Sequence, residues 1–173
     1  MKDILILYYS KNDSTKRMAR AISRGVESVA NTTAVIRTVN SKHYAESDDL
    51  LVSKEDLKNC SGMIIGSPTH FGNMAAPLKE FFDNTTEEWL NNTLESKLGG
   101  VFTSTSSMHG GQETTLLSMM LPLLHHGMLI AGVPYSVKEL SSTKSGGTPY
   151  GPSHVAHNQN SELTPEELSL IHI

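Results

Sequence analysis

The sequence predicts an α/β domain with a doubly wound parallel sheet. Residues 4–9 and 62–66 form continuous apolar runs rather than alternating ones, which suits strands that are covered on both faces, as in parallel sheets. Segments with helical periodicity alternate with the strand-like runs, and this β-α order predicts right-handed crossovers. At 173 residues the chain is long enough for one domain with a substantial core and too short for two.

The predicted elements follow one another in a simple order. After the strand at 4–9, an amphipathic helix carries Met18, Ile22, Val26 and Val29 at helical spacing. Further strands are expected at 33–39, 62–66, 100–103 and 128–133, and helices at 54–59, from Met74 to Phe82, and at 112–125 with a disturbance at Pro122. Residues 141–161 are expected to form a long loop, and residues 164–167 to open a last helix, with Thr as N-cap and Pro in its first turn.

Composition excludes several classes of function. Lys and Arg total 14 against 18 Asp and Glu, which gives a net charge of −4. Binding to nucleic acid or to an anionic membrane requires clustered positive charge, so neither is expected. The single cysteine, Cys60, cannot form an internal disulfide, so a reducing, cytoplasmic compartment is expected. No apolar stretch of about 18 residues and no signal-peptide pattern is present, so neither membrane insertion nor export is expected.

Polar loops rich in small residues follow the first, third and fourth predicted strands, at 10–15, 67–74 and 104–113. The carboxyl edge of an open parallel sheet is where ligands bind. The first loop precedes a helix N-terminus, where backbone N–H groups and the helix dipole can hold a phosphate; the alternative is that Ser14 or Asp13 merely caps the helix. The other two loops could be an ordinary turn and a flexible loop. Dinucleotide and P-loop glycine patterns are missing, which disfavours ATP and a Rossmann-bound NAD.

Several motifs together carry a resemblance to a known family. Tyr-Tyr-Ser at 8–10, Gly-Ser-Pro-Thr-His-Phe-Gly-Asn-Met at 66–74 and His-Gly-Gly-Gln-Glu-Thr at 109–114 resemble the WrbA-type NAD(P)H:quinone oxidoreductases, and the match extends through 123–128 and 146–151. The resemblance implies a flavodoxin-like fold with a five-stranded sheet in the order 2-1-3-4-5, FMN as cofactor, and a homotetramer. It also implies ping-pong chemistry, in which NAD(P)H reduces the flavin at N5 and a quinone then takes two electrons.

The resemblance also implies the site residues. FMN would be held by Ser10, Lys11, Asn12, Asp13, Ser14, Thr15, Pro68, Thr69, His70, Phe71, Gly72, Asn73, Ser104, Thr105, Ser106, Ser107, Met108, His109, Gly110, Gly111 and His125. Asn12 and Trp89 would border the substrates; without the resemblance, His125 and Trp89 would equally suit structural roles. No side chain is expected to act as catalyst, because the flavin supplies the chemistry. His154 and His157 have metal-ligand spacing but no clear third ligand, so no metal is expected.

Some residues depart from the family pattern, and two other functions stay open. Asp13 and Ser106 stand where the family usually has glycine, and Ala156-His157-Asn158 occupies a stretch that is glycine-rich in the family. Asp13 would repel a phosphate and would tolerate a positive φ less well than glycine, so weaker FMN binding is expected.

Two alternative functions remain. One is a flavodoxin-type FMN electron carrier, although a net charge of −4 is mild for such a carrier. The other is a regulatory protein, which no basic patch supports.

The C-terminal end is expected to depart from the fold. A doubly wound sheet needs helices on both faces, so a final helix is expected after the fifth strand. The first turn of that helix is expected at 164–167. Residues 168–173, Leu-Ser-Leu-Ile-His-Ile, can be back-translated into the end of a transposon used in DNA sequencing. We therefore expect a flavodoxin-like domain over 1–167, a non-native tail over 168–173, and a missing final helix that leaves an apolar strip beside the first helix uncovered.

Overall fold

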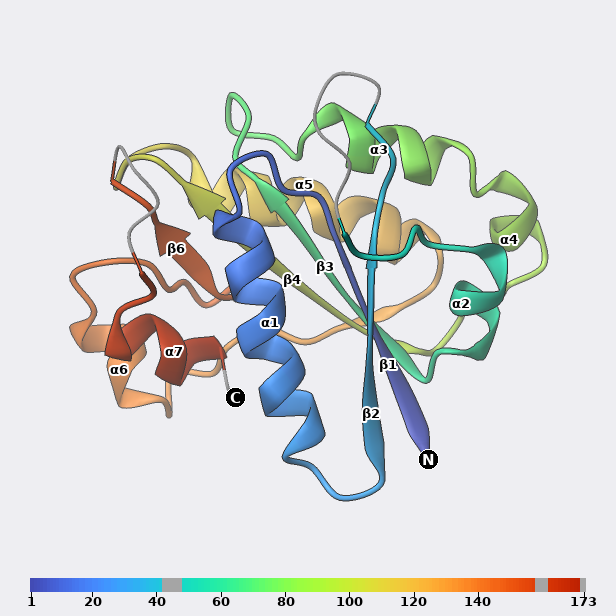
Figure 1. Cartoon of the computed structure of the whole chain (residues 1–173), viewed down its shortest axis with the longest axis horizontal. Coiled ribbons are helices and arrows are strands. Elements are labelled where there is room, and N and C mark those ends of the chain that lie inside the picture. Colours follow the sequence, from blue (N-terminus) through green and yellow to red (C-terminus); the bar gives the residue numbers. More distant parts are fainter. Residues whose placement is uncertain (42–47, 158–161, 172–173) are drawn as a thin grey trace.

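In the computed structural model, which describes residues 1–41, 48–157 and 162–171, helices flank a parallel sheet on both faces (Figure 1). The strands are β1 (Lys2–Tyr8), β2 (Thr32–Thr38), β3 (Gly62–Pro68), β4 (Leu98–Thr105), β5 (Leu129–Ile130) and β6 (Ser153–Val155). The helices are α1 (Ser14–Glu27), α2 (Lys54–Asn59), α3 (Ala76–Asp83), α4 (Thr86–Leu90), α5 (Gln112–His125), α6 (Lys138–Ser142) and α7 (Pro165–Ile171). The strand order β2-β1-β3-β4-β5 confirms the predicted fold class.

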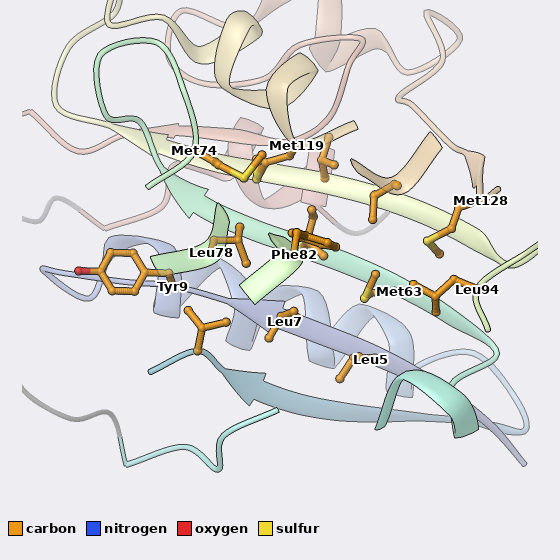
Figure 2. Packing of buried hydrophobic residues seen from close by; sticks show 14 of the residues in the cluster. Leu5, Leu7, Tyr9, Met63, Met74, Leu78, Phe82, Leu94, Met119 and Met128 are labelled. Carbon is orange, nitrogen blue, oxygen red and sulfur yellow. The ribbon is translucent and has the colours of Figure 1, made fainter. Parts of the chain in front are cut away.

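Alternation along each strand divides the core between the two faces of the sheet. Leu5 and Leu7 of β1 point to one face, where they join residues of α3 and α5 (Figure 2). Ile6 and Tyr8 point to the other face and pack with α1. Because both faces of the central strands are buried, β1 and β3 carry the continuous apolar runs seen in the sequence.

The edge of the sheet beyond β4 differs from the expectation. The fifth strand has only two residues, and a sixth strand, β6, pairs in parallel with the carboxyl half of β4, from Thr103↔Ser153 to Thr105↔Val155. The chain between β5 and β6 therefore leaves the sheet and returns to it. Gly151 permits the return, because a Cβ at this position would lie 2.2 Å from the Val101 carbonyl oxygen.

Other elements were partly anticipated. α2 and α5 have the predicted bounds, and α5 continues through Pro122 to His125. The short helices α4 and α6 were not predicted, and the boundary expected at residue 167 falls inside α7. In the described part of the chain, no helix combines the length and the apolar character that crossing a membrane requires.

Candidate functional site

A cavity of about 740 Å³ opens at the carboxyl ends of β1, β3 and β4. It brings together parts of the three loops that the sequence singled out. Its lining residues are Ser10, Lys11, Asn12, Asp13, Ser14, Thr15, Pro68, Thr69, His70, Ser104, Thr105, Ser106 and Ala156. The volume lies within the range of roughly 300–1,000 Å³ typical of small-molecule and cofactor sites.

The first loop places the start of α1 at the cavity. Asp13 is the N-cap and adopts a left-handed backbone conformation with φ 60°, and its side chain makes no capping hydrogen bond to the described residues. The Ser10 hydroxyl instead accepts a hydrogen bond from the Lys16 backbone N–H at 3.4 Å. The positive end of a 14-residue helix therefore faces the cavity, with the hydroxyl-bearing side chains of Ser14 and Thr15 beside it.

The second loop forms one wall of the cavity. Thr69 donates its backbone N–H to the Ser104 carbonyl at 2.8 Å, which fixes this loop against the third one. His70 and Asn73 exchange backbone hydrogen bonds of 2.9 and 3.1 Å, so the chain turns tightly between them. Burial, and secondly the positive charge of Lys11, lower the pKa of His70 below its ordinary value. The imidazole is therefore neutral at pH 7.

At the tip of this turn, Phe71 is fully exposed and has a positive φ of 52°. A large aromatic side chain with neither burial nor a favoured backbone conformation is costly for the isolated chain. Phe71 directly follows the lining residue His70 but does not itself line the cavity. Such placement is typical of a residue that covers a ligand or contacts a partner.

The third loop contributes only its first residues to the cavity. Ser104, Thr105 and Ser106 line it, and the Ser104 hydroxyl lies 2.8 Å from the Thr15 hydroxyl across the cavity floor. The other residues predicted for FMN lie outside the cavity lining, namely Phe71, Gly72, Asn73, Ser107, Met108, His109, Gly110, Gly111 and His125.

Trp89 and His125 lie in a separate hollow of about 480 Å³, over α3, α4 and α5. The Trp89 indole N–H donates to the His125 carbonyl at 2.9 Å. Within one chain, these two residues therefore do not lie at the 740 Å³ cavity that the first loop lines. Phe82 and His126 lie in the same hollow.

One lining residue, Ala156, was missing from the predicted site. It follows β6, and its backbone N–H donates to the Thr105 carbonyl at 2.7 Å. The sequence does contain a signal, because residues 156–158 depart from a stretch that is glycine-rich in the resembled family. Without β6, however, nothing placed this segment at the carboxyl edge of the sheet.

The chemistry of the cavity fits a phosphorylated, flat, amphipathic ligand. The end with the α1 N-terminus offers hydroxyls, backbone N–H groups and Lys11, which suit a phosphate. The other walls combine Pro68, the neutral imidazole of His70 and Ala156 with serine and threonine residues, which suit a ring with polar edges. Among the described lining residues, Asp13 alone has an acidic side chain, and its charge opposes an anion.

Comparisons with known proteins agree with this geometry. Residues 3–139 match the family described as NADPH-dependent FMN reductase. The chain is 40% identical to an NAD(P)H dehydrogenase (quinone) of Chromohalobacter salexigens, over 96% of this chain and 89% of that protein. It is 36% identical to an enzyme of the same name from Solidesulfovibrio magneticus, over 95% and 89% of the two chains. A WrbA-like flavodoxin structure from Agrobacterium tumefaciens has a TM-score of 0.71 at 22% identity, covering 99% of this chain and 91% of that one.

Proposed function

Because this chain belongs to the NADPH-dependent FMN reductase family, we propose that it holds FMN at the carboxyl edge of its sheet and reduces quinones with electrons from NAD(P)H. The observation that carries the proposal is the 740 Å³ cavity, in which the α1 N-terminus and three loops converge. The names of the relatives support quinone and NAD(P)H as the substrates.

The residues of the chain bind and orient rather than react. The first turn of α1, with the hydroxyls of Ser10, Ser14 and Thr15, would hold the phosphate. The loops at 68–70 and 104–106 would form the walls for the ring. Bound there, FMN would supply two-electron transfer at its N5, and the proposal includes a ping-pong cycle in which NAD(P)H and the quinone would use the same space in turn.

The proposal includes a homo-oligomer, with a tetramer as the expected form. Leu117, Leu121 and Leu124 lie one helical turn apart along α5 and are 43%, 60% and 54% exposed. A second copy covering this stripe would also bury apolar surface near the Trp89 hollow. Leu121→Glu should shift the assembly toward monomer in analytical ultracentrifugation; an unchanged sedimentation coefficient would contradict this interface.

Reconstitution tests the function directly. The purified chain is loaded with FMN, and the flavin released on denaturation is identified by mass. NADH and NADPH oxidation is then followed with and without benzoquinone. We expect FMN and quinone-dependent turnover; FAD, or no flavin at saturating FMN, overturns the proposed cofactor. Bound FMN without turnover would instead indicate a flavodoxin-type carrier.

The reducing cytoplasm is the compartment we propose for this activity. Cys60 is 4% exposed and has no disulfide, which is consistent with a reducing environment. Fractionation of the cells that make the protein, followed by immunoblotting, checks this localisation.

A further inference from the structure

A buried amide joins the third loop of the cavity to the sixth strand. Gln112, the first residue of α5, is 5% exposed. Its Nε2 donates to the Met108 carbonyl at 2.8 Å, and its Oε1 accepts from the Ser153 hydroxyl at 2.5 Å. A single side chain thus connects the outer half of the loop at 104–111 to β6.

The β6 end of this connection is itself firmly held. The Ser153 hydroxyl, 1% exposed, also accepts a hydrogen bond from the Gly147 N–H at 2.7 Å. The carboxylate of Glu167 on α7 accepts hydrogen bonds from the backbone N–H of Val155 at 3.1 Å and of Gly146 at 3.0 Å. Gln112 is therefore anchored to a strand whose position is fixed from both ends.

The tip of the third loop, residues 106–110, depends on this connection because its other hydrogen bonds to described residues stay within the loop. The Thr105 hydroxyl donates to the Ser107 carbonyl, and the Gly110 N–H donates to the same carbonyl. Internal bonds fix the shape of a loop but not its position relative to the sheet. The bond from Gln112 to Met108 supplies a contact to the neighbouring scaffold.

We propose that Gln112 is a positioning residue for the flavin, which acts by fixing Met108 and its neighbours beside the cavity. The inference rests on the proposed FMN function. A glutamine is required because one end of its amide donates to a carbonyl while the other end accepts from a hydroxyl. Glutamate of similar shape would keep the acceptor but place a carboxylate against the Met108 carbonyl.

Hydrogen exchange on the apoprotein and FMN titration test this role together. In Gln112→Ala we expect faster amide exchange at 106–110 and a roughly ten-fold higher Kd for FMN, since both side-chain hydrogen bonds that join Met108 to Ser153 are lost. Gln112→Glu should resemble Gln112→Ala, and Ser153→Ala should show a smaller change in the same direction. A shifted flavin absorption maximum in the loaded variants would be a further sign of a displaced loop.

A matched control separates positioning from general stability. Leu94→Ala removes a 1%-exposed core side chain just before β4 and should lower Tm without changing exchange at 106–110 or the Kd for FMN. Unchanged exchange in Gln112→Ala, or equal changes in Leu94→Ala, overturns the inference. If Gln112→Ala does not fold, Ser153→Ala decides by the same measurements. If the wild-type chain binds no FMN, the proposed function fails, whereas exchange in the apoprotein still decides whether Gln112 fixes the loop.

Discussion

Asp13 combines two unfavourable features at one residue. It has a left-handed backbone with φ 60°, and its carboxylate lines the end of the cavity proposed for a phosphate. Glycine adopts this conformation without steric cost, and its lack of charge removes a repulsion. We expect Asp13→Gly to tighten FMN binding about ten-fold, equivalent to about 1.4 kcal/mol.

Asp13→Asn separates the two effects, because asparagine removes the charge and tolerates the left-handed region. Fluorescence titration of the apoproteins with FMN gives the Kd values. If repulsion by the Asp13 charge weakens FMN binding most, both variants bind FMN more tightly. If the positive φ at residue 13 weakens it most, only the glycine variant does. Weaker binding in both variants would mean that the carboxylate helps to shape the loop.

His70 reports on the charge at the cavity wall. Burial lowers the pKa of its imidazole, and Lys11 lowers it further through its positive charge. Lys11→Met should therefore raise the pKa of His70, while burial keeps the pKa below the ordinary value of 6.5. NMR titration of the imidazole protons measures the change. Lys16→Met is the matched control, and an equal shift in both variants would contradict a specific effect of Lys11.

At the scale of elements, Glu167 links α7 to β6 and to the chain before it. Burial would raise the pKa of this carboxyl, but hydrogen bonds from the side chains of His154 and Ser145 and from the backbone N–H groups of Thr164 and Val155 outweigh burial and lower it from 4.5 to about 2. A carboxylate with a depressed folded-state pKa stabilises the protein above its unfolded pKa. This contribution, about 3 kcal/mol, is lost as the pH falls from about 4.5 through 2.

Glu167→Gln removes the titration while keeping the shape of the side chain. We expect a lower free energy of unfolding at pH 7 and a flatter pH dependence between about 4.5 and 2, measured by urea unfolding at several pH values. Glu166→Gln, at the exposed neighbouring position, should leave the pH profile close to that of the wild type. Profiles of equal steepness in all three proteins would show that Glu167 does not govern acid stability.

Helices and strands whose own residues carry a local sequence signal could be predicted. Those that form only through contacts with distant residues could not. The helix opening at 164–167 was predicted from its residue types, and Thr164 and Glu167 do form reciprocal capping hydrogen bonds of 3.2 and 2.9 Å. β6 was missed because Ser-His-Val over 153–155 has no strand signal of its own. It exists by pairing with β4, about 50 residues earlier in the chain. The same reason explains why Ala156 was absent from the predicted site.

The predicted site residues divide in the same way, into those placed by the topology of the sheet and those placed by the packing of distant helices. Residues 10–15, 68–70 and 104–106 meet because the carboxyl ends of parallel strands share one edge, which topology alone dictates. The placement of Trp89 and His125 depends on how α3, α4 and α5 pack, and the sequence holds no local signal for that. Their role in the FMN site stays a prediction.

At the scale of the whole molecule, the two faces of the sheet are covered unequally. Beside α1 lies an apolar groove of about 450 Å³. Its walls include Ile4, Ile22, Val26, Ile64, Leu98, Phe102, Leu170 and Ile171. Among the described residues, α1 and α7 both contribute side chains to the walls of this groove. Parallel sheets are normally covered on both faces, so added apolar surface that covers this groove should stabilise the fold.

We therefore predict that an amphipathic helix of about 14 residues, joined after Ile173, stabilises the protein. Burying two or three apolar side chains in the groove would contribute roughly 4–6 kcal/mol before the cost of ordering the helix, so we expect Tm to rise by several degrees. Binding of the dye ANS should fall as the apolar surface is covered. The control carries the same residues in an order that spreads the apolar side chains around the helix. Equal Tm and ANS binding in the unextended, amphipathic and control proteins would show that the groove needs no cover. A gain with the amphipathic helix alone would locate the uncovered part of the core beside α1.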